Sequence, residues 1–312
     1  MYPWNQALFD TLKRRIERLP HALLIHGARG TGKLALAEHV AQFLLCEGKT
    51  PPCGHCEGCR WFAAGSHPDF RRLEPEALAR EPLVEPEEGE APAKRAKPSL
   101  QIKIEQVRDL AGFLNLCSHR GRLRVALVHP AEEMNENAAN ALLKGLEEPP
   151  AGAVFLLVSH RPSQLLPTIR SRCQALPVPI PAREPALQWL AGEGVKNAQR
   201  WLAYAGGAPR LALEYAAKAD VLERLLQHPA PVNEREELDA LAEALQKIAL
   251  DRAFAAFGLA PKYQTGPMTG ERSRARAWLA YAREMGQHRL LTRHPLSPKL
   301  FSSEMLAGLP RR

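Results

Sequence analysis

A glycine-rich segment between two apolar stretches is the feature that most limits what this chain can fold into. The run at residues 20–26 has no helical period, and Gly27-Ala-Arg-Gly-Thr-Gly-Lys33 follows it directly. Apolar side chains at residues 34–45 then recur with helical spacing. Strand, glycine loop and helix in this order are the context of a phosphate-binding loop, in which backbone N–H groups surround phosphate and a lysine reaches its outer oxygens. An accidental glycine-rich turn is the alternative. The predicted nucleotide-binding positions are Gly27, Gly30, Thr31, Gly32 and Lys33.

Two further apolar runs extend this pattern. Residues 124–128 precede a helical stretch at about 135–148, and residues 153–158 follow at once. A weaker strand is expected near residues 100–104. Strands that alternate with helices predict a parallel sheet covered on both faces. The first half of the chain is therefore expected to be an α/β domain.

The composition then divides the chain into three domains. We predict the α/β phosphate-loop domain at residues 1–178, a small helical lid domain at 179–218 and an all-helical collar domain at 219–312. The β-type runs stop after Cys173, and the remainder is Ala/Leu-rich with helical character. Residues 74–98 are rich in glutamate and proline, so they bury too little apolar surface to offset the entropy of ordering and are expected to form a mobile loop.

The residues that handle magnesium in an active ATPase are missing from this sequence. Leu34 stands where the motif requires a serine or threonine hydroxyl. His129-Pro130 ends the second strand, where an acidic pair would hold the metal. Glu132 and Glu133 follow too late for that position and are expected on a solvated turn. Loss of one such element costs on the order of 10²-fold in rate or more, so nucleotide binding is doubtful and ATP hydrolysis is not expected.

Four of the six cysteines fall close together in the sequence. Cys46, Cys53, Cys56 and Cys59 have the spacing C-x6-C-x2-C-x2-C, with prolines and glycines between them that permit tight bends. Thiolates in C-x2-C turns chelate one ion, and a closed four-cysteine site predicts structural zinc. An iron–sulfur cluster and disulfides are the alternatives. Cys117 and Cys173 are expected to be buried apolar residues.

The net charge of the chain bears on which partners it can bind, and its hydropathy bears on where in the cell it is expected. A net charge of +8 permits contact with nucleic acid, but the basic residues are scattered, so a solvated arginine-rich surface is an equal alternative. The sequence contains no apolar run of 18 residues and no secretory signal. We therefore expect a protein of the cytoplasm without a membrane partner.

Four stretches together resemble a known family. They are His21–Gly27 with its phosphate loop, the four cysteines, Asn137–Pro150 and Ser171-Arg-Cys173. The chain resembles the clamp-loader branch of the AAA+ ATPases, and within it the subunits of bacterial DNA polymerase III. The resemblance covers residues 1 to about 215 well and the C-terminal third only by helical character.

The resemblance implies a role in DNA replication. It implies a hetero-pentamer with tau/gamma and delta subunits, joined through the helical collar, that loads a sliding clamp onto primed DNA as part of a DNA-directed DNA polymerase (nucleotidyltransferase) holoenzyme. In such loaders the arginine of Ser-Arg-Cys reaches the γ-phosphate of a neighbour's ATP, a role that falls here to Arg172; a surface arginine is the alternative. Gly207-Ala-Pro-Arg210 resembles the lid segment with a nucleotide-sensing arginine, but Arg210 could equally cap a helix or pair with an acid.

Three functions remain open from the sequence. The first is a non-hydrolysing subunit that activates a neighbour's ATPase. The second is a weak ATPase, which Lys33 supports and Leu34 contradicts. The third is a zinc-dependent nucleic-acid binding module, which leaves the phosphate loop and Ser-Arg-Cys unexplained.

Overall fold

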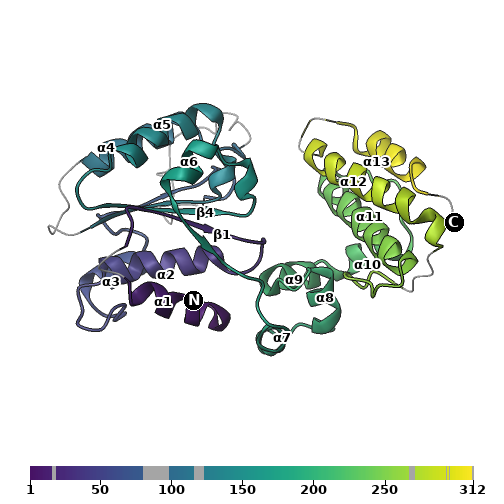
Figure 1. Ribbon diagram of the computed structural model, residues 1–312, viewed down its shortest axis with the longest axis horizontal. Helices are drawn as coiled ribbons and strands as arrows, with labels where there is room; N and C mark the ends of the chain where they lie inside the picture. Colours follow the sequence, from purple (N-terminus) through teal and green to yellow (C-terminus); the bar gives the residue numbers. More distant parts are fainter. Residues whose placement is uncertain are drawn as a thin grey trace, which may run out of the picture. The chain divides into compact units, whose positions relative to one another are not determined.

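The chain folds into two compact units in a computed structural model, residues 1–180 and residues 181–312 (Figure 1). The structure describes residues 1–15, 19–79, 98–115, 123–266, 271–292, 294 and 296–310.

The first unit is built on a five-stranded parallel sheet. The strands are β1 (Ala22–His26), β2 (Phe70–Leu73), β3 (Arg124–Val128), β4 (Ala153–Ser159) and β5 (Gln174–Pro177), in the spatial order β2-β3-β4-β1-β5. In register, Ile25 of β1 lies opposite Val158 of β4 and Leu176 of β5. The carboxyl ends of β1, β3 and β4 therefore meet at one edge of the sheet, where the phosphate loop begins.

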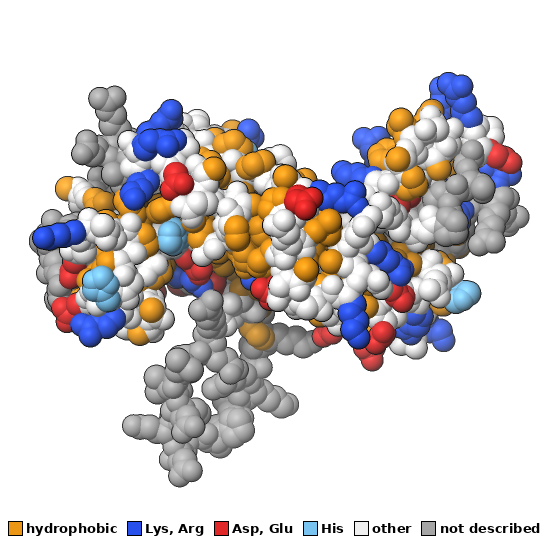
Figure 2. All heavy atoms as spheres, turned by 90° about the horizontal axis from the view of Figure 1, so that it is seen from below, with side chains coloured by type: hydrophobic (Ala, Val, Ile, Leu, Met, Phe, Trp, Pro, Cys, Tyr) orange, Lys and Arg blue, Asp and Glu red, His pale blue; other side chains and the backbone are white. Residues whose placement is uncertain are grey.

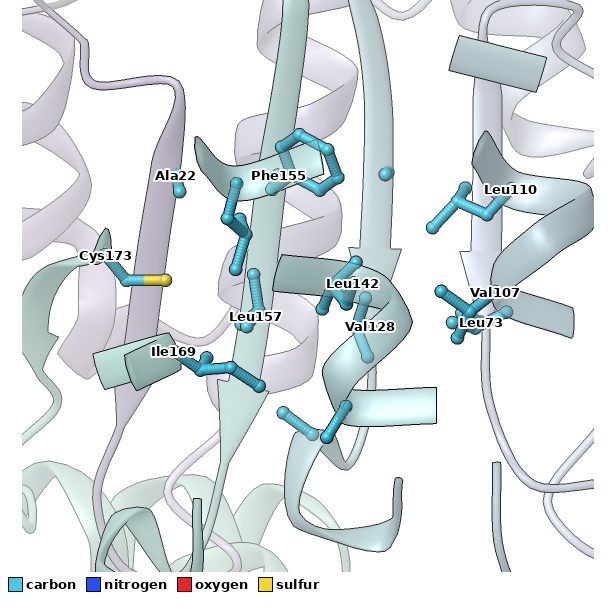
Figure 3. Close-up of a cluster of buried hydrophobic side chains, with 14 of the residues drawn as sticks. Ala22, Leu73, Val107, Leu110, Val128, Leu142, Phe155, Leu157, Ile169 and Cys173 are labelled. Atoms are coloured by element: carbon cyan, nitrogen blue, oxygen red, sulfur yellow. The ribbon is translucent and has the colours of Figure 1, made fainter. Parts of the chain in front are cut away.

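Helices cover both faces of this sheet, as the uninterrupted apolar strands predict. One face carries α4 (Ile104–Asn115), α5 (Glu136–Glu147) and α6 (Pro167–Arg172); the other carries α1 (Gln6–Lys13) and α2 (Lys33–Leu45) (Figure 1). The short helix α3 (Glu57–Ala63) follows the cysteine segment. Alternate residues of β1 enter different cores: Ala22 joins the α4–α6 side (Figure 3), and Leu23 joins the α1–α2 side.

The sequence predicted one strand that does not form and missed two strands that do. The strand expected near residues 100–104 is wrong: α4 already begins at Ile104, and Ile102 makes a single bridge with Met134. The strands β2 and β5 were not expected. Both lie at the edges of the sheet, and β5 exposes most of its side chains, so neither presents the continuous apolar run that marks the central strands.

The predicted mobile loop at 74–98 falls mostly on residues 80–97, which lie outside the described residues. Its flanks are tied together. Lys103 Nζ lies 2.8 Å from one carboxylate oxygen of Glu76, and the N–H of Ser99 donates to the other at 2.9 Å.

The second unit is helical among its described residues. It comprises α7 (Arg183–Gly192), α8 (Ala198–Tyr204), α9 (Pro209–Ala216), α10 (Ala219–Gln227), α11 (Arg235–Ala256), α12 (Ala275–Leu291) and α13 (Pro298–Ala307). One apolar cluster joins α7–α10 and another joins α10–α13, and partly buried Leu226 and Ala240 contact both clusters. The division into lid and collar at residues 218 and 219 therefore stays a prediction.

Charged side chains are dispersed over one face of the structure (Figure 2). Figure 2 shows basic and acidic groups interspersed on the face that it presents, without a continuous basic stripe. No helix in the described parts of the chain is long and apolar enough to cross a membrane.

Candidate functional site

The phosphate loop is closed by hydrogen bonds among its own residues. Lys33 is 2% exposed, and its Nζ donates to the carbonyl of Ala28 at 2.5 Å. Thr31 is fully buried, and its hydroxyl donates to the same carbonyl at 3.0 Å. Burial lowers the pKa of Lys33 to about 8, although the carboxylate of Glu132 acts in the opposite direction. The cation that would reach phosphate is thus bound to the loop itself.

The N-terminal segment packs against the same loop. Trp4 Nε1 donates to the carbonyl of Thr31 at 2.9 Å, and Asn5 Nδ2 donates to the same oxygen at 3.1 Å. The ring of Tyr2 stacks on Trp4 and lies against Gly32, where a Cβ would stand 2.5 Å from a ring carbon of Tyr2. Gly32 also has φ +82°, a conformation that other residues rarely adopt. The glycine thus serves the N-terminal contact as well as the loop. Sequence reasoning missed this contact because residues 26 to 27 positions apart leave no local signal.

Two histidines lie at the carboxyl ends of the neighbouring central strands β3 and β4. The rings of His129 and His160 meet edge to face with centroids 5.4 Å apart. Burial lowers the pKa of His129 to about 4 and that of His160 to about 3, and neighbouring charges, including Lys33, add to both shifts. The neutral imidazole of His129 therefore stands where an active ATPase would place metal-binding carboxylates, and the neutral imidazole of His160 lies against it. His160 could have been found from the sequence, because it follows a predicted strand whose carboxyl end meets that of its neighbour.

The solvated turn expected for Glu132 is wrong. Glu132 lies in the short helix η3 (Ala131–Glu133). Its Oε1 accepts the N–H of His160 at 2.9 Å, and its Oε2 is buried. Glu133 is partly buried and lies 3.2 Å from a guanidinium nitrogen of Arg161. The acids are thus engaged by the protein's own groups.

Arg172 is the last residue of α6, next to the edge strand β5. Its side chain is 34% exposed. One guanidinium nitrogen lies 2.6 Å from Oε1 of Glu147, and another donates to the carbonyl of Thr168 at 3.0 Å. Cys173 beside it is buried, and burial raises the pKa of its thiol to about 11, as expected of an apolar residue. Cys117 lies outside the described residues.

The four predicted cysteine ligands come together. All four Sγ atoms lie within 4.8 Å of one another, and those of Cys46 and Cys56 are 3.9 Å apart. A tetrahedral zinc with bonds of about 2.3 Å places its sulfurs about 3.8 Å apart. Backbone N–H groups also point at the sulfurs: Cys56 donates to Cys53, and Cys59 donates to Cys56, each at 3.3 Å. The cluster can hold one metal ion.

The surrounding fold supports this cysteine cluster. Cys46 directly follows the last residue of α2, and Cys56 caps the N-terminus of α3, so two helices fix the spacing of these cysteines. A Cβ at Gly48 would lie 2.7 Å from the Sγ of Cys53, so a larger residue would displace that sulfur. Burial favours the neutral thiols, but amide donors from Glu47 and Cys59 lower the pKa of Cys56 to about 6, whereas burial raises that of Cys59 to about 12. Four thiolates this close together would repel one another, and a bound cation would offset that repulsion.

Arg210 lies in the first turn of α9 in the second unit, exposed to solvent. The phosphate loop and the other predicted nucleotide-binding residues belong to the first unit, so Arg210 is described apart from them. Its sensing role stays a prediction.

Comparison with known proteins identifies the family. The model of the family described as "DNA polymerase III, delta subunit" matches residues 4–181. DNA polymerase III subunit delta' of Pseudomonas aeruginosa is 44% identical over 215 residues, which cover 67% of this chain and 59% of that protein. This chain belongs to the DNA polymerase III delta prime family. Subunit delta' of Escherichia coli K12 is 34% identical over 219 residues, 68% of this chain and 60% of that protein.

The match to these delta prime proteins spans about three fifths of their length. A solved structure of a DNA polymerase III gamma subunit-related protein from Thermotoga maritima has the same fold, with a TM-score of 0.52 at 19% identity, covering 96% of this chain and 97% of that one. The resemblance to the clamp-loader branch of the AAA+ proteins and the predicted fold class are confirmed.

Proposed function

We propose that this chain acts as the delta prime subunit of a DNA polymerase III clamp loader in the cytoplasm and supplies Arg172 to a neighbour's ATP without hydrolysing ATP itself. Its partners would be tau/gamma and delta subunits in a hetero-pentamer that places a sliding clamp on primed DNA. Membership of the delta prime family supports this assignment.

The closed phosphate loop is the observation that carries the non-hydrolysing part of the proposal. Lys33 and Thr31 both donate to the carbonyl of Ala28, inside the loop that would surround phosphate. Leu34 offers no hydroxyl for magnesium, and His129 offers a neutral ring instead of a carboxylate. Phosphoryl transfer depends on metal positioning and charge stabilisation, both of which these residues fail to provide.

The position of Arg172 supports the trans-acting part of the proposal. Its side chain is partly exposed at the end of a short helix, beside the edge strand of the sheet. An arginine supplied to a neighbour needs no nucleotide in its own subunit. A planar guanidinium there could bind two oxygens of the transferred phosphoryl group.

The cysteine cluster would hold structural zinc. Cys46, Cys53, Cys56 and Cys59 provide four ligands and leave no position open for a substrate, which distinguishes a structural site from a catalytic one. The zinc would fix the connection between α2 and α3.

ATP turnover by the isolated chain tests the proposal. With magnesium present, we expect no hydrolysis above background, and we expect stimulation when the chain is added to the other loader subunits. A matched Lys33→Ala variant serves as the control. Steady turnover by the parent chain that disappears in Lys33→Ala would show instead that the protein is a weak ATPase in its own right.

A further inference from the structure

The guanidinium of Arg172 makes two contacts within its own subunit, one with Glu147 and one with Thr168. Arg172 ends α6 and Glu147 ends α5, and these helices share an apolar contact through Leu142, Leu146 and Ile169. The carboxylate of Glu147 lies 2.6 Å from one guanidinium nitrogen. A second nitrogen donates to the carbonyl of Thr168, four residues earlier in the same helix. The packing of the two helices thus brings their terminal side chains together.

The stability of α5 does not explain why a glutamate stands at residue 147. Unpaired carbonyls give the last turn of a helix partial negative charge, so a carboxylate there is unfavourable. Lys144 is the basic residue of that turn, whereas Glu147 makes its ion pair with Arg172 in the next helix. The placement of Glu147 makes sense as a contact for Arg172.

This ion pair is weak enough to exchange. The side chain of Arg172 is 34% exposed and that of Glu147 is 49% exposed. Exposed pairs of this kind contribute about 0.2–1 kcal/mol, whereas an arginine that binds phosphate makes paired, charge-assisted hydrogen bonds. A neighbour's terminal phosphate can therefore displace the carboxylate, but it must compete with it.

We propose that Glu147 is a positioning residue that holds Arg172 in a withdrawn conformation until a neighbouring subunit presents ATP in the correct place. This inference rests on the proposed function, since it concerns the arginine supplied in trans. The carboxylate neutralises the charge that would stabilise the phosphoryl group. Loss of the carboxylate leaves Arg172 available more of the time, so activation depends less on correct assembly.

The test uses the reconstituted loader with a Glu147→Gln subunit. Without DNA or clamp and below saturating ATP, we expect ATPase activity to rise by about 2- to 5-fold, which is the equilibrium effect of a pair worth up to about 1 kcal/mol. Glu148→Gln removes the same charge from the adjacent exposed residue and should leave the rate unchanged. The increase should shrink as salt is raised, because salt screens exposed pairs.

A double variant separates positioning from structure. If Glu147 acts through Arg172, Glu147→Gln has no effect in a subunit that already carries Arg172→Ala. An effect that persists in that background, or a rate that is unchanged or lower in Glu147→Gln alone, overturns the inference. If Arg172→Ala alone has no effect, the proposed function fails instead. Melting curves and sizing of each variant establish equal folding and assembly, and Glu147→Asp provides a second, milder change with an intermediate expected rate.

Discussion

His129 and His160, at the carboxyl ends of β3 and β4, make the stability of the folded protein depend on pH. The folded protein takes up protons on these rings only near pH 4 and pH 3, whereas the unfolded chain does so near pH 6.5. Their contribution to stability is therefore present above pH 6.5 and is lost as the pH falls. At pH 5 the loss is roughly 2 kcal/mol for each ring.

Replacement of both rings by asparagine should flatten this dependence. The melting temperature of the parent chain is expected to fall from pH 7 to pH 5 by more than that of the His129→Asn, His160→Asn variant. Exposed His228→Asn is the matched control and should behave as the parent. An equal fall in parent and double variant would show that the two rings do not carry the effect. Circular dichroism at the two pH values provides the measurement.

The cysteine segment between α2 and α3 should carry one zinc ion per chain. Elemental analysis of protein purified without chelator measures it. Cys56→Ala should lower the zinc content sharply, because three thiolates leave the tetrahedral site open, whereas Cys173→Ala should keep it. Chelation should loosen the cysteine segment more than the sheet, because none of the four cysteines belongs to the two apolar cores of the sheet. Less than about half an equivalent of zinc, or iron in its place, would contradict the assignment.

At the level of elements, the sequence predicts what local patterns determine. The strands β1, β3 and β4 are buried on both faces and read as continuous apolar runs, so they were predicted, as were α2 and α5. The edge strand β5 exposes Gln174 and leaves no such run. The cysteine cluster was predictable because its four ligands are close in sequence. Contacts that depend on tertiary packing were not: Trp4 on the phosphate loop, and Glu147 on Arg172.

At the level of the whole molecule, a buried ion pair connects the predicted lid domain (179–218) with the predicted collar domain (219–312). Lys247 of α11 is buried, with Nζ 3.1 Å from Glu243 and 3.7 Å from the ring centre of Tyr204 in α8. The hydroxyl of Tyr215 in α9 donates to Glu243 at 2.6 Å. The predicted boundary at residue 218 is therefore bridged by a polar network that sequence periodicity cannot reveal, since it depends on residues far apart in the chain.

The central claim is that Arg172 activates a neighbour's ATP site, and the DNA- and clamp-stimulated ATPase of a reconstituted loader tests it most directly. Arginine fingers contribute roughly 10³-fold or more where they act alone, but one site among several would face this subunit. Arg172→Ala should therefore lower the total ATPase rate of the loader by less than about 10³-fold. The clamp-loading rate should fall by a larger factor than the ATPase rate. Arg170→Ala, an exposed arginine of the same helix, should keep both rates. Equal assembly by sizing with both rates unchanged in Arg172→Ala would contradict the account.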